Sequence, residues 1–267
     1  MTTTSSSPGA RLALGGIVTD WQQVLRTQSA ELGVELTDAQ LGAFDRYLGL
    51  LLDWNRRINL TSITDPARMA VLHFLDSLTC LAASAFPARS CVADVGSGAG
   101  LPGIPIAIAR PDLRVTLFES VSKKCRFLEA AISTAGLRNA AVSCTRAEAA
   151  GRDPGLRESF DVVATRAVAE LAVAAELCLP LARLGGAAVM MKGPGARDEI
   201  ARGSAAVMIL GGELEFARDF TLQAPGERVS RTIIWLRKRA PTPERYPRAP
   251  GRPAKRPLGI DTSPSQG

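Results

Sequence analysis

A glycine-rich turn directly after a short apolar segment constrains the fold of this chain more than any other feature. Val92-Ala93-Asp94-Val95 has the composition of a buried strand, and Gly96-Ser97-Gly98-Ala99-Gly100 follows it before a helical stretch. Glycines let the backbone turn tightly and let a ligand approach more closely than any Cβ would permit. The order strand, glycine turn, helix therefore predicts an α/β fold whose turn can lie against a ligand.

Short apolar or β-branched segments alternate with helical patterns through the rest of the chain. This alternation predicts a parallel sheet with helices on both faces. Residues 168–184 are interpreted as an apolar helix that ends at Gly185-Gly186, and two further segments flank a turn at 223–226, which predicts an antiparallel pair at the sheet edge. The predicted strands are 92–95, 115–118, 141–144, 160–163, 187–191, 219–222 and 232–236.

The first third of the chain has helical patterns in place of alternating strands and helices, after a polar N-terminal segment. Residues 1–15 are rich in Thr, Ser, Gly and Ala and are expected to be disordered. Residues 16–88 are predicted to form a helical cap, because Thr37 begins a capping-box pattern and Asp65-Pro66 is a second helix start. We expect the sheet domain to span 89–239 and a Pro- and Arg-rich tail, without regular helix or central strand, to span 240–267.

The positive charge of the chain is concentrated near its C-terminal end. Ten Lys or Arg residues and one acid, Glu244, lie between Arg228 and Arg256. That window carries +9, whereas the whole chain carries +6, so the remaining residues carry −3. Such asymmetry indicates a polyanionic partner, nucleic acid above all, although a charge run can also be solvated surface.

An acidic residue at the end of the second predicted strand indicates which kind of ligand the glycine turn could bind. Glu119 lies 23 residues after Gly96, where a carboxylate can accept hydrogen bonds from the two hydroxyls of a ribose. The turn and the acid together indicate a site for a nucleoside cofactor. A purely structural turn is the alternative.

The register of the glycines separates two classes of cofactor. Gly98-x-Gly100-x-x-Gly103 matches the dinucleotide fingerprint, but its first glycine comes three residues after the strand ends. Asp94-x-Gly96-x-Gly98-x-Gly100 begins on the strand itself, as in S-adenosylmethionine methyltransferases. Asp94 would orient the turn or the methionine amine of that cofactor, or simply stabilise the loop. A NAD(P)-binding enzyme is the weaker alternative, since the single histidine, His73, lies upstream.

An ordered series of motifs resembles the bacterial RsmG family, also called GidB, over roughly residues 36–239. The resemblance implies a Rossmann-like class I methyltransferase fold: a seven-stranded, mostly parallel sheet with an N-terminal helical cap. It also implies transfer of a methyl group from S-adenosylmethionine to guanine N7 in the 530 loop of 16S ribosomal RNA. The motifs are Leu52-x-Trp54-Asn55-x-x-Ile58-Asn59-Leu60-Thr61, His73-x-x-Asp76-Ser77, 94–105, Glu119-Ser120-x-x-Lys123-Lys124-x-x-Phe127-Leu128, Arg146-Ala147-Glu148, Arg166-Ala167 and Lys192-Gly193.

The resemblance assigns roles position by position. Gly96 and Leu101 would lie beside the methionine end of the cofactor, and Glu119 would hold the ribose. Ala147 and Glu148 would lie beside the adenine, and Arg166 near the methionine or the incoming base. The full set of expected cofactor-binding residues is Asp94, Gly96, Gly98, Gly100, Leu101, Glu119, Ala147, Glu148 and Arg166.

Basic residues outside the glycine turn are the expected contacts for RNA. Lys123 and Lys124, near a helix start, are either phosphate contacts or solvated charge. His73 and Asp76 lie three apart and are expected to share a helix face, so they either bond to each other or receive RNA. Trp54 and Phe127 are expected to be core residues. The expected RNA contacts are His73, Lys123, Lys124, Arg166, Lys192, Arg231, Arg237 and Lys238, with further grip from Arg239, Arg245, Arg248, Arg252, Lys255 and Arg256.

Methylation of guanine N7 needs no general base, because N7 is an unprotonated acceptor with an exposed lone pair. Positioning of that lone pair in line with the methyl group can account for about 7–11 kcal/mol of a barrier. We therefore assign no catalytic acid or base. An RNA-binding ribosome assembly factor that keeps the fold without turnover stays open as the alternative function.

The five cysteines are odd in number and widely spaced, without a C-x-x-C pair, so buried thiols are expected rather than disulfides or a zinc site. No metal is expected. Every apolar run is interrupted by a charge or a proline, which argues against a membrane span. We expect a cytoplasmic protein, monomeric, whose partner is 16S rRNA or the small ribosomal subunit.

Overall fold

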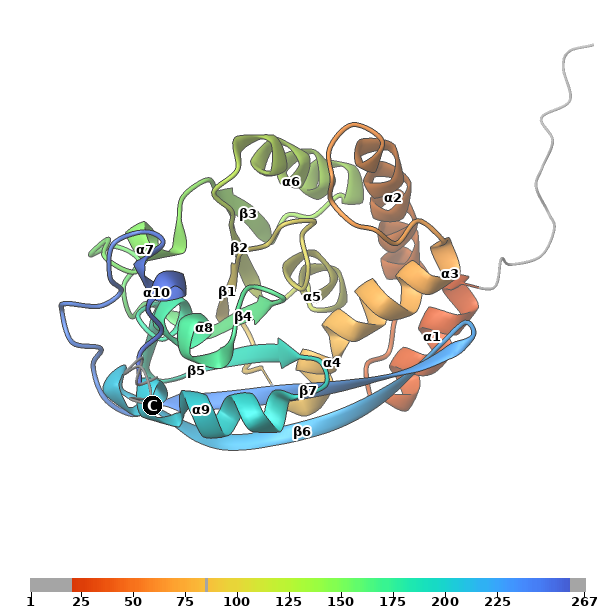
Figure 1. The fold of residues 1–267 in the computed structure, drawn as a ribbon. Coiled ribbons are helices and arrows are strands. Elements are labelled where there is room, and N and C mark those ends of the chain that lie inside the picture. The colour runs from red at the N-terminus through yellow and green to blue at the C-terminus, as the bar shows by residue number, and fades with distance from the viewer. Residues whose placement is uncertain (1–20, 85, 260–267) are drawn as a thin grey trace, which may run out of the picture.

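A computed structural model describes residues 21–84 and 86–259 of the chain. The expected disorder of 1–15 lies outside these residues, as do the last eight residues of the tail. A seven-stranded sheet forms the centre of the molecule, in the order β3-β2-β1-β4-β5-β7-β6 (Figure 1). The strands are β1 (Cys91–Val95), β2 (Arg114–Phe118), β3 (Ala140–Ser143), β4 (Phe160–Arg166), β5 (Ala182–Lys192), β6 (Gly212–Ala224) and β7 (Glu227–Lys238).

The sheet confirms the predicted fold class. Strands β1 to β5 pair in parallel, while β7 runs antiparallel to both β5 and β6. The predicted strand segments lie within observed strands, except that β3 ends one residue earlier, at Ser143, and the predicted antiparallel pair turns at Pro225-Gly226 with β6 at the sheet edge. Parallel strands direct their carboxyl ends to one edge, so the glycine turn after β1 and Glu119 after β2 emerge side by side.

Alternate residues along the strands face two separate apolar cores. In β1, Val92 packs with the core that contains α5 (Gly103–Ala109) and α6 (Ser122–Ala135), whereas Ala93 packs with the core on the other face. That second face is covered by α7 (Ala147–Ala150), α8 (Leu171–Cys178) and α9 (Ala196–Ile209) (Figure 1). This period of two is what burial of both sheet faces requires.

The helical cap packs against the same face as α5 and α6. It contains α1 (Trp21–Glu31), α2 (Asp38–Asn55), α3 (Pro66–Met69), the π-helix η1 (Ala70–Leu75) and α4 (Asp76–Ala83). Thr37 forms the predicted capping box with Gln40, and the Asp65 side chain accepts the Arg68 N–H as the predicted second N-cap. The β6–β7 hairpin extends from the sheet to this cap, where Arg68 pairs with Glu227 (Figure 1).

Two helices on the second face of the sheet differ from expectation. The helix predicted for 168–184 ends at Cys178, because residues from Ala182 onward join β5, which passes through Gly185-Gly186. A continuous apolar run has no period that separates helix from strand. Helix α9 was not predicted.

The tail packs back onto the domain. Its final turn is α10 (Arg252–Lys255), a short helix where none was expected. The Arg248 guanidinium pairs with Glu176 of α8 at 2.6 Å, and the Glu176 side chain is fully buried. Arg157 donates to the carbonyls of Thr242 and Tyr246 at 2.5 and 2.8 Å. The tail between Thr242 and Arg248 is therefore held against the domain by partly buried polar contacts.

Candidate active site

The glycine turn is fixed between the ends of three strands. The backbone N–H groups of Gly96 and Ser97 donate to the Phe118 carbonyl at the end of β2, at 2.9 and 3.1 Å. A Cβ on Gly96 would stand 2.7 Å from a methyl group of Val168, just beyond β4, and the residue has φ +75°. Both the left-handed backbone and the contact require glycine here. Gly98 and Gly100 also have positive φ.

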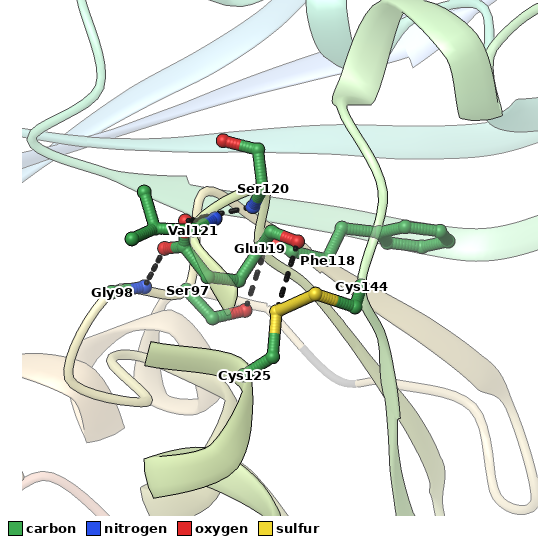
Figure 2. The surroundings of a disulfide bond; sticks show 8 residues. All are labelled: Ser97, Gly98, Phe118, Glu119, Ser120, Val121, Cys125 and Cys144. Atoms are coloured by element: carbon green, nitrogen blue, oxygen red, sulfur yellow. Dashed lines mark hydrogen bonds between the residues drawn. A yellow bond between two sulfur atoms is a disulfide. The ribbon is translucent and has the colours of Figure 1, made fainter. Parts of the chain in front are cut away.

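The Glu119 carboxylate joins the turn to the start of α6. One oxygen, Oε2, accepts the Gly98 N–H at 3.0 Å, and Oε1 accepts the N–H groups of Ser120 and Val121 at 2.7 and 2.8 Å (Figure 2). A carboxylate has about four lone-pair sites, so these three bonds leave one on Oε2. Glu119, which was expected to hold a ribose, thus contacts the turn directly. Its carboxylate can accept one further hydrogen bond, not the two that a pair of ribose hydroxyls would donate.

Asp94 at the end of β1 is completely buried beneath the turn. Its Oδ2 accepts the Gly103 N–H at 3.0 Å, while Oδ1 has no hydrogen-bond partner among residues 21–84 and 86–259. Burial raises the pKa of Asp94 to about 7. Gly103 permits this arrangement, since a Cβ there would lie 2.1 Å from a Leu117 methyl group. Leu101, in the same turn, is largely buried.

A disulfide lies beneath Glu119 and corrects the expectation of free thiols. Cys125 near the start of α6 is bonded to Cys144 just after β3, and the Cys125 sulfur also lies 3.4 Å from the Glu119 carbonyl oxygen (Figure 2). The two cysteines are 19 residues apart, and only the packing of α6 against β3 brings their Cα atoms to 5.8 Å. Cys80 and Cys178 are buried free thiols, as expected, and burial raises the pKa of each.

Glu148 lies at the same edge of the sheet, because β2 and β3 end together. It follows Ala147 at the start of α7, and its carboxylate accepts the Gly251 N–H of the tail at 3.0 Å. The tail therefore closes against the segment that was expected to flank an adenine. The sequence did not predict this contact, because nothing in the sequence of the tail indicates where the tail packs.

Arg166 at the end of β4 is held by the helical cap. Its Nη2 donates to the Leu72 carbonyl at 2.8 Å, and Nη1 lies 3.3 Å from the His73 carbonyl and 3.4 Å from Asp76 Oδ2. The first two acceptors belong to the π-helix η1 and the third begins α4. A π-helix inside a longer helix is frequent at functional sites. The cap also reaches the glycine turn, where Tyr47 of α2 donates to the Ala99 carbonyl.

A cavity of about 440 Å³ opens beside Arg166. The loop after β4, the end of β5, and Asp76 and Arg231 line it. Arg231 donates to Asp76 Oδ2 at 2.9 Å, and Lys192 pairs with Glu199 at 2.7 Å. The cavity falls in the size range of ligand pockets, about 300–1,000 Å³. Of the expected RNA contacts, it brings together Arg166, Lys192 and Arg231.

The expectations for His73 and Lys238 need correction. His73 is buried and faces Thr61, with Nε2 2.7 Å from its hydroxyl, and burial lowers the pKa of the imidazole to about 4. It does not bond to Asp76, because the π-helix turns its residues out of the α-helical spacing. Lys238 is 1% exposed and pairs with Glu158 at 3.1 Å; burial lowers its pKa to about 8. Neither side chain can reach a phosphate in this structure.

The other expected RNA contacts lie apart from the cavity. Lys123, at the start of α6, is exposed and Lys124 beside it is partly so, close in sequence to Glu119. Arg237 pairs with Glu215 on the outer strands at 2.7 Å. Phe127 is a core residue, as expected, whereas Trp54 is only partly buried and packs edge to face against it, with ring centroids 5.7 Å apart.

Similarity to known proteins decides the family. The family model of GidB, rRNA small subunit methyltransferase G, matches residues 40–227, more than half of the chain. The chain belongs to the GidB family. Proteins named ribosomal RNA small subunit methyltransferase G are similar over most of their length: that of Pelotomaculum thermopropionicum is 47% identical over 88% of this chain and 98% of its own, and that of Symbiobacterium thermophilum is 46% identical over 90% and 99%.

Solved structures share the fold at low identity. TYW2 of M. jannaschii in complex with AdoMet has a TM-score of 0.50 and 16% identity, over 69% of this chain and 80% of that one. A putative transferase, PH0793 of Pyrococcus horikoshii, has a TM-score of 0.50 and 16% identity, over 66% and 64%. These matches support the Rossmann-like arrangement that the GidB membership implies.

None of the helices between residues 21 and 84 or between 86 and 259 has the length and apolar character needed to cross a membrane. Within the same two ranges, no three His, Cys, Asp or Glu side chains gather closely enough to hold a metal ion.

Proposed function

We propose that this protein transfers a methyl group from S-adenosylmethionine to N7 of a guanine in the 530 loop of 16S ribosomal RNA. Membership of the GidB family carries this proposal, because the relatives are named for methylation of small-subunit ribosomal RNA. Bound S-adenosylmethionine would supply the electrophilic methyl group. A ribosomal substrate makes the cytoplasm the place of action, with the small subunit or its RNA as partner.

The residues around the glycine turn fit such a cofactor. Glu119 keeps one lone-pair site free for a ribose hydroxyl, while its other sites hold the turn in place. Asp94 is completely buried beneath the turn, where its Oδ2 accepts the Gly103 N–H, so we assign it the role of holding the turn in shape. Gly96, Gly98 and Gly100 present no side chains, and Leu101 lies in the same turn. We assign the methionine end of the cofactor to this turn and the ribose to Glu119.

Two further positions complete the cofactor site that we propose. Ala147 and Glu148 would flank the adenine at the carboxyl end of β3. The Glu148 carboxylate already accepts the Gly251 N–H, so its role is to shape this wall together with the tail. Arg166, anchored in the cap, would stand between the cofactor and the incoming base.

The chain's own residues have a positioning task in this reaction. Guanine N7 carries no proton, so no group has to remove one, and alignment of the lone pair lowers the barrier. The cap, tied to the glycine turn through Tyr47 and to β4 through Arg166, holds the two halves of the site in fixed relation. The product purine is cationic, and Asp76 or an RNA phosphate would offset that charge.

Exposed basic residues would hold the RNA through its phosphates. Four of them lie in the tail up to residue 259, and two begin α6 beside Glu119. If the tail binds RNA, replacing Arg252, Lys255 and Arg256 by alanine weakens binding and flattens its salt dependence, by about 0.7 in slope for each single-strand phosphate that the variant no longer neutralises. A slope equal to that of the unmodified protein would refute this role of the tail. The proposed phosphate-binding residues are Lys123, Lys124, Arg245, Arg252, Lys255 and Arg256.

Labelled methyl transfer tests the proposed function. The protein is incubated with radiolabelled S-adenosylmethionine and small subunits that lack the modification, and the RNA is then cleaved with borohydride and aniline. Scission at one guanine of the 530 loop supports the proposal. Subunits that already carry the methyl group are the control and should accept no label. Binding to subunits without label transfer would instead favour an assembly factor.

A further inference from the structure

The cavity beside Arg166 is lined by a buried carboxylate, and no residue in the described part of the chain donates to one of its oxygens. Asp76 lines the cavity and is 1% exposed. Its Oδ2 accepts from Arg231 Nε at 2.9 Å and lies 3.4 Å from Arg166 Nη1, whereas Oδ1 has no hydrogen-bond partner within the ranges that the structure describes. A buried carboxylate oxygen without a donor is costly, and such atoms are rare in folded proteins. Because Asp76 lines the cavity, we expect a donor for this oxygen to approach from that side.

The cavity lies beside the proposed cofactor site rather than within it. In the sheet, β2 and β3 lie on one side of β1, and β4 and β5 on the other. Glu119 and Glu148 follow β2 and β3, while the cavity is formed at the ends of β4 and β5. Val168 connects the two, since it lines the cavity and touches the position that a Cβ on Gly96 would fill. A group bound in the cavity would therefore face the methionine end of the cofactor.

The chemistry of Asp76 restricts what the cavity can accept. An ionised carboxylate only accepts hydrogen bonds, so it selects a base that presents donors. Guanine presents two adjacent donors on its Watson–Crick edge, N1–H and the 2-amino group, whereas the other bases present at most one there. The 2-amino group also projects from the end of the purine opposite to N7. A contact at that end leaves N7 free to face the cofactor.

We propose that Asp76 Oδ1 accepts a hydrogen bond from the 2-amino group of the target guanine and so determines the choice of base. This inference rests on the proposed function. Arg166 and Arg231 fix the orientation of the carboxylate by binding its other oxygen. Together with Lys192, which is partly neutralised by Glu199, they leave the cavity with a small positive charge suited to a phosphate-linked base.

A comparison of guanine with inosine tests the inference, because inosine lacks only the 2-amino group and keeps N7. Reconstituted small subunits carry either base at the target position, and label transfer gives kcat/KM for each. The unmodified protein should methylate the inosine substrate about tenfold to a hundredfold less efficiently, the loss expected for one hydrogen bond to a charged group. Asp76→Asn should methylate both substrates at similarly low efficiency.

Asp161→Asn is the matched control. It breaks the 2.7 Å ion pair of Asp161 with Arg183 at the opposite end of the strands, and it should keep the full preference for guanine. Equal use of guanine and inosine by the unmodified protein would overturn the inference without requiring any variant to fold, and would leave the proposed function standing. An Asp76→Asn protein that still prefers guanine as strongly would also overturn it. Failure to methylate either substrate would overturn both proposals.

Discussion

Replacing Glu119 with glutamine keeps the size of the side chain but removes its charge and one of its two acceptor atoms. The carboxylate accepts three backbone N–H groups, at 2.7, 2.8 and 3.0 Å. A glutamine carbonyl can keep the bonds from Ser120 and Val121, but its amide NH2 then faces the Gly98 N–H. The turn loses its tie to α6, and the free lone-pair site on Oε2 disappears.

The cost follows from the number of bonds removed. A hydrogen bond to a charged group contributes about 1.5–3 kcal/mol, and the Gly98 N–H would lose such a bond. We expect the free energy of unfolding to fall by about 2 kcal/mol. Without the ribose contact, binding of S-adenosylmethionine should weaken by about tenfold to a hundredfold, since each factor of ten corresponds to about 1.4 kcal/mol.

Calorimetry with S-adenosylmethionine measures the affinity, and urea denaturation measures the stability. Glu129→Gln is the control, because Glu129 is exposed on α6, which follows Glu119 in the chain, and the substitution is chemically identical. It should leave both quantities unchanged. A Glu119→Gln protein that binds the cofactor within twofold of the unmodified protein would refute the assignment of Glu119 to the ribose.

Three further changes should have measurable effects. Burial lowers the pKa of His73 to about 4, so between pH 6.5 and 4 the unfolded chain binds a proton that the folded chain does not. The unmodified protein should therefore lose up to about 3 kcal/mol more of its free energy of unfolding than His73→Gln as the pH falls through this range. Urea denaturation at a series of pH values measures the difference. Arg248→Ala leaves the buried Glu176 carboxylate without its ion pair and should lower the free energy of unfolding by about 3 kcal/mol, whereas Arg252→Ala should not; equal denaturation midpoints for the two variants would contradict this. Reduction of the Cys125–Cys144 disulfide reopens a loop of 19-residue separation, so thiol treatment should cost about 3 kcal/mol in the unmodified protein and nothing in a Cys125→Ser, Cys144→Ser double variant.

Strands β1 to β4 were predictable because they are short and apolar and helical patterns separate them, whereas β5, β6 and β7 extend well beyond the segments predicted for them. Helix α9 was missed in a segment that contains Gly203, a residue that weakens a helical pattern. In the structure that glycine has a packing reason, since a Cβ would lie 3.0 Å from Leu171 of α8. The glycine at this position is required by contact between two helices, and the periodicity of the sequence carries no information about such contacts.

The chemistry of the site was predictable where it depends on strand order and not where it depends on side-chain packing. Glu119 meets the glycine turn because adjacent parallel strands end together. Charge counting, by contrast, could not tell that Lys238 and Arg248 turn inward to Glu158 and Glu176. The Cys125–Cys144 bond was missed for the same reason, because pairing depends on the distance between α6 and the segment after β3.

The clasp of Arg166 by the π-helix has a consequence for protein engineering. The guanidinium donates hydrogen bonds to the carbonyls of Leu72 and His73, so the orientation of this side chain on the sheet depends on a helix far upstream in the chain. Arg166 would lose these acceptors in a truncated sheet domain, or in a chimera whose leading helices are exchanged for another RNA-targeting module. Any transplant of this scaffold must bring residues 66–83 with it.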